Sequence, residues 1–151
     1  MFTTVRYFVK TSIIFLIVGI FTGLYMSLDK HLFYIGFSPE LISAHTHIIL
    51  VGSVMMMIMG VALWFFPRAE KDDKKYNPDL ILVTYWIMTV STALRFLFQV
   101  IGSFIESKYI ETGISVFSIF QVLAIILFFY AMWGRIRGVG SQYREAKGEK
   151  F

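Results

Sequence analysis

Four long apolar runs, almost free of charge, follow one another along the chain with short polar segments between them. They cover residues 11–28, 41–66, 79–101 and 112–133. A helix crosses the hydrocarbon core of a bilayer with roughly 20 apolar residues, and each run is close to that length or longer. The pattern therefore predicts an all-α integral membrane protein, a four-transmembrane-helix bundle formed by one domain over residues 1–151.

The first run could be mistaken for a secretory signal peptide. The stretch from Thr11 to Leu28 is longer than the usual apolar core of such a peptide, and no small-residue cleavage site follows it. We therefore expect this segment to be a retained helix.

Composition agrees with the pattern and narrows the chemistry. Hydrophobic residues make up 57% of the chain, and the mean hydropathy is +0.69. Soluble domains have about 45–50% apolar residues. The absence of cysteine excludes disulfides and thiolate chemistry. The net charge of +4 comes from residues in loops and tails, which fits a topology signal and not a nucleic-acid patch.

Lysine and arginine are distributed unevenly over these loops and tails. The two connections predicted on one side of the membrane carry only Lys30 and Lys108. The other side carries Arg6, Lys10, Arg68, Lys71, Lys74, Lys75, Arg135, Arg137, Arg144, Lys147 and Lys150. Because positive loops stay cytoplasmic, we expect both termini in the cytoplasm and the chain in the plasma (inner) membrane. The histidines then lie near the outer face.

Two of the three histidines lie in the first turns of the second predicted helix. Ionisable residues within a span usually face the bundle interior and mark function. His45 and His47 are two residues apart, about 200° around an α-helix, so they cannot face one small ligand together. The face of His45 continues through Gly52, Met56, Met59 and Gly60. The face of His47 continues through Leu50, Val51, Val54, Ile58, Val61 and Phe65.

These neighbours favour His45 as the inward-facing ligand, because small residues let a helix or a flat ligand approach closely. The face of His47 looks lipid-exposed or packed against aliphatic side chains. His47 would then snorkel to the interface or meet a neighbouring subunit. The alternative for His45 is a structural histidine, hydrogen-bonded across helices. The methionines at positions 55, 56, 57 and 59 fit packing better than ligation.

Arg95 is a charge within the third predicted helix, which is costly unless it is paired. Because this helix runs from inside to outside, Arg95 lies near its outer end, at a depth similar to that of His45. A guanidinium forms bidentate bonds with carboxylates, which suits the propionates of an iron porphyrin. Snorkelling, or an ion pair with Glu106 or Glu111, is the alternative.

The segment Ser43-Ala44-His45-Thr46-His47, through Gly60 to Pro67-Arg68, resembles the second helix of the catalytic subunit of heme–copper oxidases and nitric oxide reductases. The segment Gly19–Asp29 (GIFTGLYMSLD) also resembles the start of such subunits. The resemblance covers the first two predicted helices. It implies that His45 is an axial ligand of a low-spin heme b, an iron protoporphyrin IX.

The chain also departs from that family. A complete catalytic subunit has many more helices than the four predicted here. Residues 79–133 contain no histidine, so the family's second low-spin ligand is missing, as are the histidines for copper and the high-spin heme. We therefore do not expect this polypeptide alone to reduce oxygen or nitric oxide. It resembles a short relative that keeps the low-spin heme end of the fold.

Three functions follow from the residues and the resemblance. The first is a small b-type cytochrome-like membrane protein for electron transfer, or for gas or heme binding. His45 is its iron ligand, with His47 or His31 as further candidates. Arg95 would hold a propionate, and the remaining site residues are Gly52, Met56 and Gly60. The second function is copper or zinc handling by the histidines and nearby methionines. The third is a non-catalytic structural or assembly subunit.

The expected partners are membrane lipids, a second copy of the chain, and a redox partner or a quinol. A six-coordinate heme needs two axial donors, and four helices provide little protein surface to enclose a porphyrin. A homodimer is therefore predicted, in which a second copy supplies more surface and a second ligand. Gly19 and Gly23 provide a surface for close helix contact, within the chain or between two chains.

Overall fold

The computed structural model describes residues 2–66, 77–136, 140 and 147–148. Over these residues the chain is helical, and four segments are long and apolar enough to cross a membrane. They are Thr3–Phe33, Pro39–Phe65, Pro78–Gly102 and Lys108–Arg135. The prediction of four membrane-spanning helices is therefore confirmed, and these helices indicate a multi-pass membrane protein.

The first two spans contain more than plain α-helix. α1 (Phe2–Leu28) is followed directly by the π-helical turn η1 (Asp29–Phe33). It begins well before Thr11, and the fully buried Phe8 in this earlier part belongs to the core. The second span consists of α2 (Pro39–His47), the π-helix η2 (Ile48–Met55) and α3 (Met56–Phe65). Pro39 occupies the first turn, where a missing N–H breaks no helical bond.

The third and fourth spans form a simple antiparallel pair. α4 covers Pro78–Gly102, and α5 covers Lys108–Met132 before the short 3-10 turn η3 (Trp133–Arg135). The side chain of Asn77 caps α4 by accepting a hydrogen bond from the Asp79 N–H at 2.8 Å. α5 starts at Lys108 and not at Thr112, since the extended residue Ser107 already ends the loop. The charged segment 68–76 and most of the tail after residue 136 lie outside the described residues.

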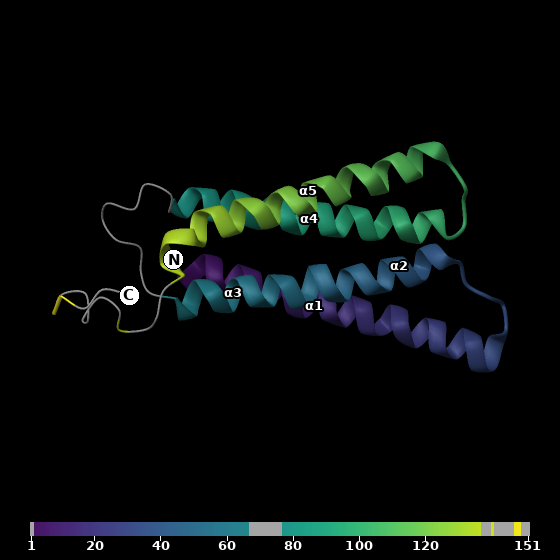
Figure 1. Ribbon diagram of the computed structural model, residues 1–151. Helices are drawn as coiled ribbons and strands as arrows, with labels where there is room; N and C mark the ends of the chain where they lie inside the picture. Colours follow the sequence, from purple (N-terminus) through teal and green to yellow (C-terminus); the bar gives the residue numbers. More distant parts are fainter. Residues whose placement is uncertain (1, 67–76, 137–139, 141–146, 149–151) are drawn as a thin grey trace.

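The spans pack as two hairpins side by side (Figure 1). α4 packs along α5, α1 packs along η2 and α3, and α2 joins the two hairpins by packing against α4. The core follows these contacts. It contains Phe8, Phe15, Ile48, Met56, Met59, Leu63, Ile81, Tyr85, Met88, Ala124, Phe128, Ala131 and Met132. The start of α1 and the end of α5 lie at one end of the bundle. We call the opposite end, which holds η1, the start of α2 and residues 102–108, the distal end.

Asp29 holds the chain reversal at the distal end. Its carboxylate is buried and accepts backbone N–H bonds from Ile35 at 3.1 Å and Gly36 at 2.9 Å. Its carbonyl accepts the N–H of Tyr34, which adopts a left-handed conformation with φ of 55°. These bonds turn the chain from η1 toward α2. The buried Asp29 at the start of η1 therefore helps to position the helix that carries His45 and His47.

Arg135 closes the other end of the bundle. Its side chain is fully buried, and its Nη2 donates to the carbonyls of Leu63 and Phe66, each at 3.0 Å. These carbonyls belong to the last turn of α3, where backbone acceptors lack helical partners and a cation is favourable. The end of the fourth span is thereby fastened to the end of the second.

Candidate functional site

His45 lies on α2 and faces α1. Its Nδ1 is 2.9 Å from the carbonyl oxygen of Gly19. Since a carbonyl only accepts, Nδ1 carries the proton and Nε2 keeps its lone pair. No described residue forms a hydrogen bond with Nε2. The half-buried ring thus has one nitrogen fixed by the protein and one available as a donor to a metal.

Gly19 and Gly23 provide the surface that receives this histidine. A Cβ added at Gly23 would lie 2.7 Å from Cε1 of His45 and 3.3 Å from its Nδ1. One at Gly19 would collide with the side chain of Ile49. The close-contact surface predicted from these two glycines is therefore used within the chain, between α1 and the second span.

His47 faces the other way, toward α4. Its Nε2 lies 2.9 Å from Nη2 of Arg95, and its Nδ1 lies 2.8 Å from the carbonyl oxygen of Ser43. A guanidinium only donates and a carbonyl only accepts, so His47 is neutral with the proton on Nδ1. The expectation that His47 faces lipid or aliphatic side chains is wrong. α2 packs against α4, so the side of α2 that carries His47 meets another helix.

The error concerns His47 alone. Beyond His47 the projected faces agree with burial, although η2 is a π-helix with i→i+5 hydrogen bonds. The residues projected onto the face of His45 are buried, namely Gly52, Met56, Met59 and Gly60. Much of the face projected from His47 is indeed exposed: Leu50, Val54, Ile58, Val61 and Phe65. His47 itself is half-buried and contacts Arg95.

A polar network extends from His47 across three helices. Nη1 of Arg95 donates to Oε1 of Gln121 on α5 at 2.7 Å. Nε2 of Gln121 in turn donates to Oγ1 of Thr92 at 2.9 Å. One turn nearer the distal end, Nε2 of Gln99 donates to Oγ of Ser43 at 2.7 Å. α2, α4 and α5 are thus joined by side-chain bonds inside the apolar bundle, where few other polar contacts compete.

The positive charge of Arg95 is opposed by the nearby carboxylate of Glu40, although the described residues form no direct ion pair with it. Its two terminal nitrogens bond to His47 and Gln121, which are both neutral, and its Nε is buried without a partner. The expected alternative of an ion pair with Glu106 or Glu111 is not formed. A buried guanidinium nitrogen that no described residue bonds is a candidate binding group for an anion.

The remaining predicted site residues mainly serve packing. Gly52 is buried where α1 and α4 approach, because a Cβ there would lie 2.9 Å from both Phe15 and Thr92. Gly60 faces Phe8 and Val9 in the same way, and Met56 is fully buried in the core. All three residues are buried inside the bundle.

His31 is separate from the other two histidines. It is exposed on η1 at the distal end. Over the described residues, which include all three histidines, no group of three or more His, Asp or Glu side chains is placed to hold a metal ion.

The sequence does not predict the hydrogen bonds that join Arg95 to Gln121, Gln121 to Thr92 and His47 to Ser43. Their signal was present in the sequence, since amides such as Gln99 and Gln121 are unusual within apolar runs. These side chains meet because α2 packs against α4 and α4 packs against α5. Sequence periodicity does not show which helices are neighbours.

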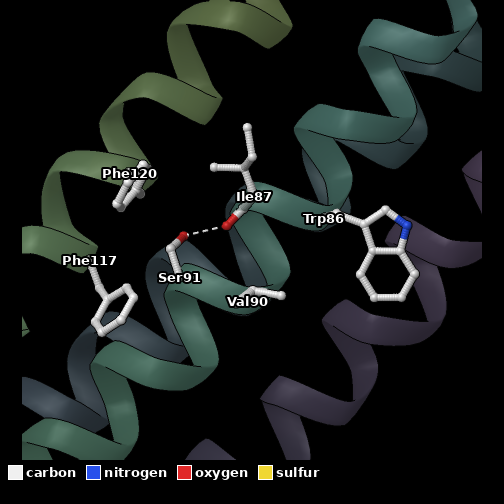
Figure 2. A pocket seen from close by; sticks show the side chains of 6 residues that line it. All are labelled: Trp86, Ile87, Val90, Ser91, Phe117 and Phe120. Atoms are coloured by element: carbon white, nitrogen blue, oxygen red, sulfur yellow. Dashed lines mark hydrogen bonds between the residues drawn. The ribbon is translucent and has the colours of Figure 1, made fainter.

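Two cavities lie near the network but do not include His45. An apolar pocket of about 340 Å³ lies between α4 and α5, with Phe117 and Phe120 on one side and Trp86 on the other (Figure 2). Ser91 in this pocket already donates to the Ile87 carbonyl at 2.6 Å. The second cavity, about 350 Å³, opens at the distal end. Its lining includes Ser38, Glu40, Ser103, Glu106 and Glu111.

A comparison with protein-family models, with curated proteins and with solved structures finds no match for this chain.

Proposed function

We propose that this chain is a small membrane protein that binds heme b, with His45 as an axial ligand of the iron. The observation that carries the proposal is the bond from Nδ1 of His45 to the Gly19 carbonyl. Histidines that bind metals usually donate their second ring N–H to a carbonyl or carboxylate, which orients the ring and makes Nε2 a better donor. His45 has this arrangement and an unused Nε2.

Of the two histidines on α2, only His45 has a ring nitrogen that would be available to bind iron as an axial ligand. A bound heme iron would supply one-electron redox chemistry and gas binding. His45 would hold it, while the lone pair of His47 accepts from Arg95 and is not available. The second axial position is then left open, or is filled by a methionine, by His31 or by a second copy of the chain. An open position favours gas binding, and a filled one favours electron transfer.

Arg95 is the group proposed to bind a propionate. Its buried Nε, which no described residue bonds, supports an anionic ligand at this position. His47 and Gln121 would then orient the guanidinium through its two terminal nitrogens. We also propose that both termini are cytoplasmic in a plasma (inner) membrane. A redox partner or a quinol would exchange electrons with the protein.

A second candidate is supported by the same bond at His45. A hydrogen bond between α1 and α2 also suits a purely structural histidine in an assembly subunit. The two functions differ in what the purified protein contains. The chain is therefore purified in detergent after expression with heme supplied, and its porphyrin, iron, copper and zinc are quantified. Stoichiometric porphyrin and iron support the heme proposal. Protein free of porphyrin supports the structural function, and copper or zinc without porphyrin supports metal handling.

A further inference from the structure

Gly19 and Gly23 lie one α-helical turn apart on α1, and both face His45 or its neighbours. The Gly19 carbonyl is 2.9 Å from Nδ1 of His45, and the ring edge lies where a side chain at Gly23 would be. We infer that this pair positions the His45 imidazole. Gly19 fixes the tautomer of the ring, and Gly23 sets how closely the ring approaches α1. The consequence for iron rests on the proposed heme function, whereas the positioning itself does not.

The steric part of the inference follows from the position of the ring. A Cβ at residue 23 would lie 2.7 Å from Cε1, closer than real carbon contacts, and 3.5 Å from Nε2. The contact is relieved only if the His45 ring rotates or α1 moves away from α2. Both movements lengthen the bond between Nδ1 and the Gly19 carbonyl, because that bond joins the same ring to the same stretch of α1.

The electronic part follows from the hydrogen bond. An imidazole that donates its Nδ1–H to a carbonyl has a more basic Nε2 and binds a metal more tightly. Losing such an outer partner typically costs about 10- to 100-fold in metal affinity. A better donor also stabilises the oxidised iron, so losing the bond makes the heme reduction potential more positive. Gly23 is thus a positioning residue that acts on the iron only through His45.

Gly60 offers a matched control for Gly23. A Cβ at Gly60 would lie 3.0 Å from Cβ of Phe8 and 3.1 Å from Cγ2 of Val9. It therefore crowds the same pair, α1 against the second span, near the start of α1 and away from His45. Gly60→Ala reproduces the general loosening of the two helices without touching the imidazole.

The positioning is tested first in protein without heme. Nitrogen NMR of ¹⁵N-histidine-labelled protein in detergent, assigned with His45→Ala, reports the proton on each ring nitrogen. We expect His45 to carry a single proton on Nδ1 in the wild type and in Gly60→Ala. We expect Gly23→Ala to lose this fixed tautomer. A Gly23→Ala protein that keeps the wild-type signal would overturn the inference. A Gly60→Ala protein that loses it equally would also overturn it.

Heme-loaded protein then tests the effect on the ligand. We expect Gly23→Ala to lower heme affinity by about 10-fold or more and to make the reduction potential more positive. If the wild type binds no heme, the proposed function fails and the NMR result still decides the positioning. If the wild type binds heme and Gly23→Ala has the same affinity and potential, the inference fails while the proposed function stands.

Discussion

Nη2 of Arg95 lies 2.9 Å from Nε2 of His47, and this contact uses the lone pair that His47 would need to bind a metal. His45, two residues earlier, has its proton on the same nitrogen, but no described residue bonds its Nε2. The two histidines of one helix are therefore in the same tautomer with different partners. His47 bonds to α4 through Arg95, and His45 bonds to α1 through Gly19.

Replacing Arg95 by leucine tests the network. The change leaves Nε2 of His47 and Oε1 of Gln121 without their donor. Each unsatisfied buried acceptor costs about 1–3 kcal/mol, so we expect a lower thermal midpoint in detergent. Membrane insertion is retained, because removing a charge from a span eases insertion. We also expect heme occupancy to fall.

The matched variant is Arg95→Lys, which keeps the charge but offers a single nitrogen in place of the fork. It should retain part of the heme occupancy and part of the stability. Wild-type heme occupancy in Arg95→Leu would instead assign Arg95 to packing or snorkelling alone.

Arg135 gives a second prediction, which concerns stability and not the site. Arg135→Gln removes the charged donor to the carbonyls of Leu63 and Phe66. Hydrogen bonds to charged groups contribute about 1.5–3 kcal/mol, and we expect a loss of stability of that order. The readout is thermal unfolding in detergent, with Lys10→Gln as a control for removing an exposed charge. A drop in the Arg135 variant no larger than in the control would contradict its role at the end of α3.

The sequence was sufficient for the architecture because membrane spans are specified by length and hydropathy. The four runs correspond to the four spans, although each span begins before its predicted start. The inward face of His45 was also predictable, since glycines and buried methionines follow it at helical spacing.

The partners of His47 and Arg95 could not be predicted. Their contact depends on α4 packing against the His47 side of α2, and sequence periodicity does not show which helix packs there. Gly19 and Gly23 could contact another helix of this chain or a helix of a second copy. Their spacing alone does not distinguish the two cases. Arg135 carried no local signal, because its partners are carbonyls about seventy residues earlier in the chain.

Membrane orientation is tested by reporter fusions. The charge distribution predicts that a fusion at Lys150 is cytoplasmic and that one placed between Gly102 and Lys108 is exported. A phosphatase active only outside the cytoplasm and a fluorescent protein active only inside give opposite readings at each site. Phosphatase activity at Lys150 would reverse the predicted topology.

The predicted homodimer is tested by mass in detergent. Light scattering with the detergent contribution subtracted should give twice the 17.5 kDa of one chain. Because Gly19 and Gly23 are used within the chain, Gly23→Ala should not abolish the dimer directly. A monomer with a fully low-spin heme would refute a site shared between copies, and it would point to His31 or a methionine as the second ligand.

The central claim is that His45 binds heme iron and His47 does not. Absorption spectra of the purified protein, oxidised and then reduced with dithionite, test it with His45→Ala and His47→Ala measured in parallel. We predict a Soret band and reduced-state bands of a b-type heme in the wild type. His45→Ala should lose them, and His47→Ala should keep most of the heme. A colourless wild type, or a pigment that survives in His45→Ala and disappears in His47→Ala, would contradict the account.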